Sequence, residues 1–213
     1  MRESQGKFVP KERRPILDEL VMTVLSQATS DVNSGRAFAL LKERFPRWDE
    51  VADAPTGEVA DAIRPGGIAD VKARRIQEIF DEIESREGGL DLHRLNDLPD
   101  EEVTDYFTSL PGVGPKTAAC VLVFAMGRDA FPVDTHVHRI VKRLRWVEPK
   151  ADAEATHRIL EPRIPPELRY DLHVAMIRHG REVCVPHDPF CTRCVVLDFC
   201  DAGPRFIADG AAR

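Results

Sequence analysis

Apolar residues recur at three- and four-residue intervals along most of the chain, which is the pattern of amphipathic α-helices. We find no pair of segments with alternating apolar and polar residues, and 131–134 is too short to count as a strand. The pattern therefore predicts an all-α protein. The predicted helices cover 16–28, 33–45, 68–88, 100–110, 115–127, 134–146, 151–163 and 166–183.

Proline and glycine mark where several of these helices begin and end. Pro99 and Asp100 open one helix, which ends at Pro111 because proline fits the first turn of a helix but not its interior. Segments 62–76 and 109–122 share the order of helix, Pro-Gly turn and helix. We therefore expect the same supersecondary unit twice.

The size and composition of the chain place it among globular proteins. Its 213 residues suffice for one sizeable domain or two small ones, and 43% of them are hydrophobic. No apolar run approaches the roughly 20 residues that a membrane helix needs. Residues 1–14 are polar and lack the apolar core of a signal peptide. We expect a cytoplasmic protein, associated with the nucleoid if it binds DNA, and no membrane partner.

Four of the five cysteines crowd into one short segment, Cys184-x6-Cys191-x2-Cys194-x5-Cys200, and Cys120 stands apart. Thiols stay reduced in the cytosol, so metal binding or catalysis is favoured over disulfides. Zinc sites often use two short cysteine pairs, whereas this segment has one pair and two single cysteines. Four thiolates in one compact loop favour a [4Fe–4S] cluster over zinc.

The segment 110–117, Leu-Pro-Gly-Val-Gly-Pro-Lys-Thr, joins two predicted helices through a tight turn. Gly112 and Gly114 permit the reversal, and Pro115 suits the first turn of the next helix. The backbone N–H groups of the two glycines are then free to bind a phosphate. A plain helix–helix turn is equally consistent with this composition.

Lys116 follows the turn in the first turn of a helix, where the helix dipole disfavours a positive charge. Partial burial would lower its pKa further. A lysine that is neutral part of the time can act as a nucleophile and form a Schiff base. A lysine that binds phosphate as a simple cation is the other interpretation.

Asp134 lies in Pro-Val-Asp-Thr-His, directly before a predicted helix. An aspartate in that position typically caps the helix. The same carboxylate stays ionised and can face a cleft, so capping and catalysis are compatible. Basic residues of the helix could also hold DNA: Arg139, Lys142, Arg143 and Arg145.

The formal net charge of −6 argues mildly against nucleic acid as a partner. The charge is unevenly distributed, however, because 135–150 carries five Lys and Arg residues against one Glu. Phosphate attraction depends on local contacts, so a basic face on an acidic protein can still bind DNA.

Taken together, these motifs resemble the endonuclease III family of helix-hairpin-helix (HhH-GPD) DNA glycosylases. The resemblance extends from about residue 16 to residue 200. The segments that carry it are VLSQATSDV (24–32), LPGVGPKTA (110–118), VDTHVHRI (133–140), LHVAMIRHGREVC (172–184) and the cysteine loop.

The resemblance implies two helical domains that flank a DNA cleft. A six-helix barrel with the hairpin would span 18–129. An iron–sulfur domain would combine 1–17 with 130–213, with its cluster loop at 184–200. The four clustered cysteines would hold the [4Fe–4S] cluster.

The resemblance also implies a bifunctional glycosylase and AP lyase, with Lys116 as nucleophile and Asp134 as catalytic carboxylate. The implied substrate is double-stranded DNA with an oxidised or saturated pyrimidine that is flipped out of the helix. A monomer would excise the base and nick the abasic strand by β-elimination.

Further DNA contacts follow from the resemblance. A family glutamine usually fills the gap left by the flipped base, and an ungapped alignment puts Ala28 there with Gln27 one residue earlier. Ile68, after the Pro-Gly turn, is the second candidate to enter the duplex. The other expected DNA contacts are Gly112, Gly114, His136, Arg139 and Arg193.

Three other functions are open at this point. An adenine glycosylase acting on mismatches shares the cluster but lacks the lysine, and it needs a glutamate where this chain has Thr23. A mismatch thymine or uracil glycosylase usually lacks the lysine as well. A non-catalytic DNA-binding or electron-transfer protein would use only the cluster. Lys116 and Asp134 in their expected places favour the lysine-bearing enzyme.

Overall fold

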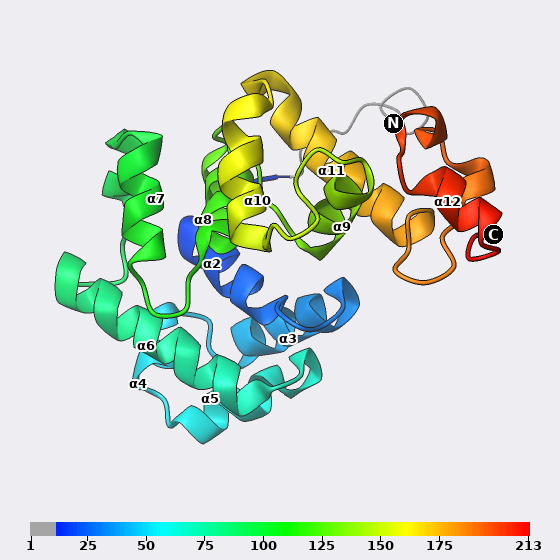
Figure 1. Ribbon diagram of the computed structural model, residues 1–213. Coiled ribbons are helices and arrows are strands. Elements are labelled where there is room, and N and C mark those ends of the chain that lie inside the picture. Colours follow the sequence, from blue (N-terminus) through cyan, green and yellow to red (C-terminus); the bar gives the residue numbers. More distant parts are fainter. Residues whose placement is uncertain (1–11) are drawn as a thin grey trace. The chain divides into compact units, whose positions relative to one another are not determined.

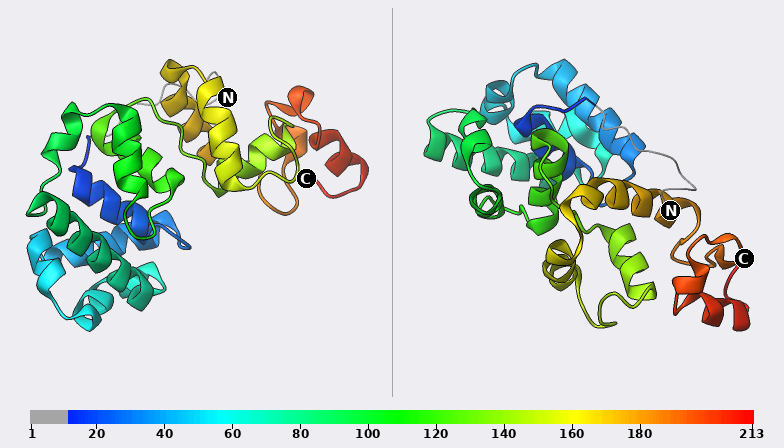
Figure 2. Two further views of the ribbon diagram at one scale, coloured as in Figure 1. Left: turned by 60° about the vertical axis from the view of Figure 1, so that its left-hand side comes forward. Right: turned by 90° about the horizontal axis from the view of Figure 1, so that it is seen from above.

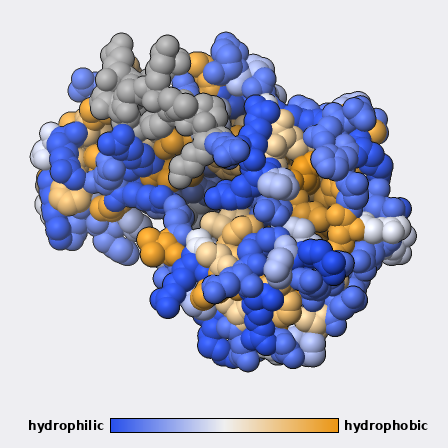
Figure 3. All heavy atoms as spheres, turned by 180° about the vertical axis from the view of Figure 1, so that it is seen from behind, coloured by the Kyte–Doolittle hydropathy of each residue, from blue (hydrophilic) through white to orange (hydrophobic). Residues whose placement is uncertain are grey.

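The computed structural model of the chain, which describes residues 12–213, consists of helices joined by short turns (Figure 1). No strand occurs within these residues, and the all-α prediction is confirmed. Contacts group the chain into two compact units, Glu12–Arg128 and one that contains Asp129–Arg213. None of the described helices is long and apolar enough to cross a membrane. The face shown in Figure 3 is mostly hydrophilic, with hydrophobic residues in scattered patches.

The first unit contains long and short helices in close succession. They are α2 (Ile16–Leu25), α3 (Asp31–Arg44), α4 (Trp48–Asp53), α5 (Thr56–Ile63), α6 (Ala69–Glu87), α7 (Asp100–Thr108) and α8 (Pro115–Val121). Shorter turns of helix lie between or after them: η1 (Arg64–Gly66), η2 (His93–Asp97) and the π-helical η3 (Leu122–Met126).

Helix α2 packs against α3, α6 and α8, and α6 also packs against α4 and α5 (Figure 2). The apolar residues at helical spacing meet in one core, which includes the fully buried Leu20, Ile63, Phe80 and Phe107. Burying each such side chain contributes roughly 1.5–3 kcal/mol of transfer free energy. This core fixes the positions of the turns that connect the helices.

The repeated unit expected at 62–76 and 109–122 is present. In the first copy, α5 leads through η1 to α6, and Gly67 adopts a left-handed backbone with φ 73°. In the second copy, α7 leads to α8, and Gly112 adopts φ 65°. Glycine reaches this region without the steric cost that a Cβ brings.

The second unit is smaller. Its helices are α9 (Thr135–Arg143), α10 (Ala153–Leu160), α11 (Pro166–Glu182) and α12 (Gly203–Ala208), with short turns η4 (Glu161–Arg163), η5 (Cys191–Arg193) and η6 (Leu197–Phe199). Helix α9 packs against α10 and α11. Phe131, Val137, Ile140 and Met176 lie in its core, against which Cys184 and Cys200 also pack.

Several elements differ from those expected. The helix predicted at 115–127 ends at Gly127 as expected, but it changes from α8 to the π-turn η3 on the way. The helix predicted at 134–146 ends at Arg143, and Arg145 adopts φ 58° beyond it. Helices α4 and α12 were missed because six residues are too few to show a helical period.

The boundary of the first unit also lies earlier than the expected residue 18. Residues 12–17 belong to this unit, whereas the sequence analysis assigned 1–17 to the cluster domain; 1–11 lie outside the described residues. Leu17 is buried, and an ion pair of 2.9 Å between Arg14 and Glu19 links the segment before α2 to that helix.

Candidate functional site

Lys116 is the second residue of α8, directly after the glycine hairpin. Gly114 caps the helix with an extended backbone, and the N–H of Val113 donates to the carbonyl of Leu110 at 3.2 Å to close the turn. The Lys116 side chain is half-buried. The hairpin thus presents a lysine at a helix start, as the sequence predicted.

Gly112 and Gly114 are both exposed at the hairpin. A Cβ on Gly112 would lie 1.3 Å from Nη1 of Arg75, so the guanidinium of Arg75 lies against the hairpin backbone. The positive φ of 65° favours glycine at position 112, whereas the guanidinium of Arg75 could move to make room for a side chain. Arg75 brings a positive charge close to the turn where a phosphate was expected.

Glu19 on α2 is a buried carboxyl group close enough to Lys116 to interact with it electrostatically. Its side chain is 7% exposed and pairs with Arg14. Burial raises the pKa of Glu19, and Arg14 and Lys116 oppose this shift. Sequence reasoning missed Glu19, although a glutamate among the buried residues of an apolar helix face was a visible signal.

Asp134 lies in the second unit, where it caps α9. Its Oδ1 accepts a hydrogen bond of 2.8 Å from the N–H of Val137, and the side chain is half-exposed. The capping role weighed in the sequence analysis is confirmed. Lys116 lies in the first unit and Asp134 in the second.

Arg139 makes internal hydrogen bonds on the helix that Asp134 opens. Its Nε donates to the carbonyl of Cys184 at 2.9 Å, and its Nη2 donates to the carbonyl of Gly180 at 2.8 Å. The same Nη2 lies 3.0 Å from Nδ1 of His136. Burial lowers the pKa of His136 and of Arg139. The DNA contacts expected of these two residues stay predictions, because in this structure both side chains bind their own unit.

The four clustered cysteines line one shared hollow. Apolar side chains and the guanidinium of Arg143 complete its wall. The Nη1 of Arg143 donates to Sγ of Cys184 at 3.1 Å, and the N–H of Gly203 donates to Sγ of Cys200 at 3.3 Å. Donors aimed at sulfur stabilise thiolates, which are the form that binds metals.

The arrangement of the sulfurs bears on which metal they fit. Among the described residues, no group of three or more Cys, His, Asp or Glu side chains is placed to hold one metal ion. A single zinc ion needs each sulfur about 2.3 Å away. The four cysteines around one hollow supply the all-cysteine ligand set that an iron–sulfur cluster uses.

The burial of these thiols in the hollow also affects their protonation. Burial and the neighbouring cysteines raise the pKa of Cys191, and burial raises the pKa of Cys194. Thiols with raised pKa values lose their protons when a metal binds, so metal binding at this loop releases protons.

The residues expected to enter DNA lie at two exposed loops of the first unit. Gln27 and Ala28 follow α2, and Ala28 has a left-handed backbone with φ 52°. Ile68 precedes α6 with φ 42° and is 58% exposed. A side chain with a Cβ in this region costs on the order of 1–3 kcal/mol, and such strain clusters at functional sites.

Arg193 lies on the short turn η5 of the cysteine loop. Its side chain is exposed, its Nη2 donates to the carbonyl of Glu182 at 2.8 Å, and its guanidinium carbon lies 4.2 Å from the ring centre of Phe190. Its contact with phosphate stays a prediction.

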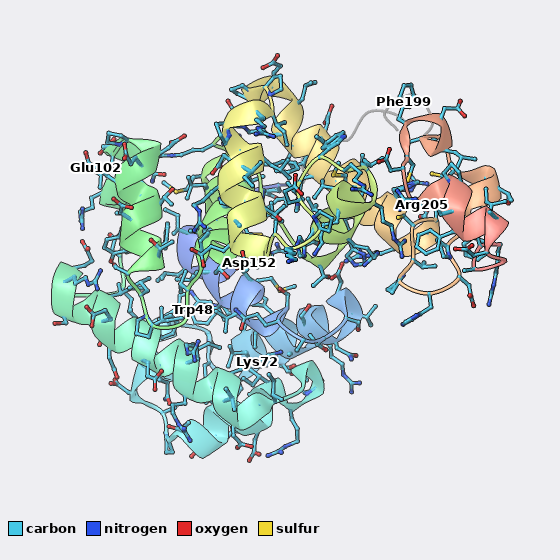
Figure 4. All side chains as sticks on the ribbon, in the orientation of Figure 1. Trp48, Lys72, Glu102, Asp152, Phe199 and Arg205 are labelled. Carbon is cyan, nitrogen blue, oxygen red and sulfur yellow. The ribbon has the colours of Figure 1, made fainter. Side chains whose placement is uncertain are left out.

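Sequence reasoning also missed Lys72, a buried lysine on α6 (Figure 4). Its Nζ donates to the carbonyls of Leu25 and Gly66, at 2.7 and 2.8 Å. The signal was its spacing, because Lys72 occupies a core position in the pattern formed by Ala69, Ala73 and Ile76.

Comparisons with known proteins show which family the chain resembles. Endonuclease III of Thermotoga maritima is 36% identical over 182 residues, covering 85% of this chain and 81% of that protein. An Arabidopsis thaliana protein, provisionally named a DNA glycosylase, is 44% identical over 170 residues; these cover 80% of this chain and 58% of the longer plant protein.

A solved structure has the same fold over most of its length. It is a trapped covalent intermediate of endonuclease III with DNA, which superposes with a TM-score of 0.83 at 28% identity and covers 97% of this chain and 92% of that one. Residues 21–166 match the family described as HhH-GPD superfamily base excision DNA repair protein. With its glycine hairpin, all-α fold and these relatives, the chain belongs to the HhH-GPD superfamily of base excision DNA repair proteins.

Proposed function

We propose that this protein is a bifunctional DNA glycosylase and AP lyase that acts through Lys116. The observation that carries the proposal is the position of Lys116 at the start of α8, half-buried and within the electrostatic reach of the buried Glu19. The covalent DNA complex of endonuclease III, with which this chain shares its fold, supports a covalent route.

The chemistry requires a neutral amine and a stabilised positive charge on the sugar. The Nζ of Lys116 attacks C1′ of the flipped nucleoside, and the bond from C1′ to the base nitrogen breaks with its electron pair going to the base. The carboxylate of Asp134 stabilises positive charge on the sugar and helps to deprotonate Lys116. The leaving base takes up a proton.

The nick follows from the covalent intermediate. Loss of a proton from nitrogen and opening of the sugar ring give an imine between Lys116 and C1′. The imine acidifies the C2′ hydrogen, and its removal expels the 3′ phosphate by β-elimination. Water then hydrolyses the imine and releases Lys116.

We propose double-stranded DNA with an oxidised or saturated pyrimidine as the substrate, acted on by a monomer. The resemblance of the 24–32, 110–118 and 133–140 segments to the endonuclease III family supports this substrate class. Thr23, which is buried on α2, argues against an adenine glycosylase, because that branch needs a glutamate at this place.

We also propose that the four clustered cysteines hold a [4Fe–4S] cluster. Their shared hollow and the donors from Arg143 and Gly203 fit this group. When bound, the cluster supplies iron–thiolate bonds that cross-link the 184–200 loop. None of the proposed reaction steps uses it.

Borohydride trapping on abasic duplex DNA tests the proposal. The wild-type protein should form a covalent adduct and should nick duplexes that carry thymine glycol, dihydrouracil or 5-hydroxycytosine. The Lys116→Ala variant should do neither while keeping its helical circular dichroism. Excision without any trapped adduct would instead indicate a monofunctional uracil, thymine or adenine glycosylase, and DNA binding without excision would indicate a non-catalytic protein.

A further inference from the structure

Lys72 is a lysine buried inside the apolar first unit. It is the fourth residue of α6, and the residue as a whole is 2% exposed. Burial lowers its pKa, and no charged neighbour contributes to this shift. Placing an ammonium group in such an environment is costly, so the contacts that it makes there require an explanation.

The ammonium group joins two carbonyls that are far apart in the sequence. One belongs to Leu25, the last residue of α2, and the other to Gly66, the last residue of η1. The carbonyls at the end of a helix lack partners within it, and a cation there also opposes the helix dipole favourably. Lys72 therefore serves as a shared cap for both segments.

Each carbonyl belongs to the residue directly before a loop that was expected to enter DNA; we call this residue the root of the loop. Leu25 is followed by the 26–30 loop, in which Gln27 and Ala28 are exposed. Gly66 is followed by the 67–68 loop, which carries Ile68. Moreover, the backbone N–H of Lys72 donates to the carbonyl of Ile68 at 3.1 Å. One residue thus contacts the roots of both loops.

The space around Gly66 shows how closely the two roots approach. A Cβ on Gly66 would lie 3.1 Å from Cβ of Ala37 and 4.0 Å from both the carbonyl oxygen of Leu25 and Nζ of Lys72. Both loops also hold a strained backbone, at Ala28 and at Ile68. Strained residues persist only where the surroundings fix them.

We propose that Lys72 is a positioning residue that holds the 26–30 and 67–68 loops together in the geometry in which both enter the DNA duplex. The proposal rests on the proposed function, because it concerns how that activity reaches its substrate. Lys72 touches neither DNA nor the reacting atoms. Its role is to hold the two loops rigidly relative to each other. One loop can then fill the gap left by the flipped base while the other is inserted between stacked bases.

The variant Lys72→Met tests this role because methionine has a similar length but no donor. We expect single-turnover cleavage of a lesion in duplex DNA to fall by roughly 10- to 100-fold, as for misplacement by about 1 Å. Single-stranded abasic DNA needs no flipping, so borohydride trapping on it should stay within about twofold of wild type. Lys42→Met is the matched control, since Lys42 also donates to a carbonyl, that of Pro46 at 2.6 Å.

A second measurement does not depend on base excision or strand cleavage. In a duplex with 2-aminopurine opposite a tetrahydrofuran abasic analogue, entry of the loops should unstack the fluorescent base and raise its emission. Wild type and Lys42→Met should show this rise. Lys72→Met and Gly66→Ala, which crowds the same junction, should lose most of it while still binding the duplex.

The outcomes separate this inference from the proposed function. If wild type cleaves no lesion but its fluorescence signal depends on Lys72, the proposed activity is wrong and the positioning role stands. If wild type is active and Lys72→Met matches it on duplex DNA and in fluorescence, the positioning role is wrong. An equal loss on single-stranded and duplex substrates would reduce Lys72 to a residue needed only for folding.

Discussion

Asp134 accepts a hydrogen bond of 2.8 Å from the backbone N–H of Val137, and so the proposed catalytic carboxylate also caps α9. Two substitutions separate these roles. Asp134→Asn keeps a good capping group but removes the charge, and it should lower the single-turnover excision rate by roughly 10²–10⁴-fold. Its unfolding midpoint in urea should stay close to that of wild type.

Asp134→Ala is the matched comparison, because it removes both the charge and the cap. It should lose excision to the same degree and also about 1 kcal/mol of unfolding free energy. An asparagine variant with a normal excision rate would leave Asp134 with the capping role alone.

Lys116 and Asp134 lie in different units, so their cooperation at one reacting sugar is best tested by combining their variants. The double variant Lys116→Ala with Asp134→Asn should be no slower in base excision than Lys116→Ala, because residues that act in one step are strongly non-additive. Single-turnover rates on a thymine glycol duplex measure this. If the rate losses of the two single variants instead multiply in the double variant, the two residues act in separate steps.

The four cysteines around the shared hollow should each be needed for iron, and the buried Cys120 should not. Single serine variants of Cys184, Cys191, Cys194 and Cys200 should lose iron and sulfide after anaerobic purification. Cys120→Ser is the control, since Cys120 packs as a small apolar residue on α8 of the other unit. Stoichiometric zinc without iron in the wild-type protein would contradict the cluster.

The exposed loop after α2 should set the preference among lesions. Ala28 is too short to fill the space of a flipped base, and we expect thymine glycol, which is puckered and stacks poorly, to be processed better than the near-planar 5-hydroxycytosine. Ala28→Gln should raise activity on 5-hydroxycytosine the most. The left-handed backbone at position 28 is equally unfavourable for alanine and for glutamine, so the free energy of unfolding should change little.

Gln27→Ala is the control for this alignment. If it abolishes activity while Ala28→Gln leaves every lesion unaffected, Gln27 is the residue that fills the gap. Excision rates on duplexes that differ only in the lesion distinguish the two.

The buried Glu19 predicts a pH dependence of stability. Its pKa is raised above the ordinary 4.5, so the folded state favours the protonated form and its contribution to stability is lost as the pH rises through the raised value. Glu19→Gln cannot ionise. Relative to wild type, its unfolding free energy should therefore improve between about pH 5 and pH 8.

Glu58→Gln is the control, because Glu58 is an exposed partner of Arg44. Urea unfolding at both pH values and constant ionic strength provides the measurement. An equal change in both variants would show that burial of Glu19 is not the cause.

The main helices could be predicted from the sequence because their apolar positions repeat over several turns. Helix α6, at 19 residues, was found to within a residue at either end. The π-turn η3 was not foreseen, because the apolar pattern of 115–127 continues through it and only the hydrogen bonding changes.

The polar contacts were harder to predict because their partners are distant in the sequence. The carbonyl that Lys72 binds on Leu25 lies 47 residues away. Arg139 was counted as part of a basic face, but its donors reach carbonyls 41 and 45 residues away. Sequence spacing revealed that Lys72 sits in a core position, and only the fold revealed what it binds there.

The internal hydrogen bonds of α9 have a consequence for how the protein responds to ionic strength. A DNA-binding protein loses affinity with added salt in proportion to the phosphates it neutralises, because each neutralised phosphate releases condensed counterions. Arg139 and Arg143 donate instead to carbonyls of their own unit, among them those of Cys184 and Val185, and the chain as a whole carries a net charge of −6. We therefore expect a shallow decrease of DNA affinity with salt and little attraction to undamaged duplex, so that recognition depends mainly on how easily the damaged nucleotide leaves the stack.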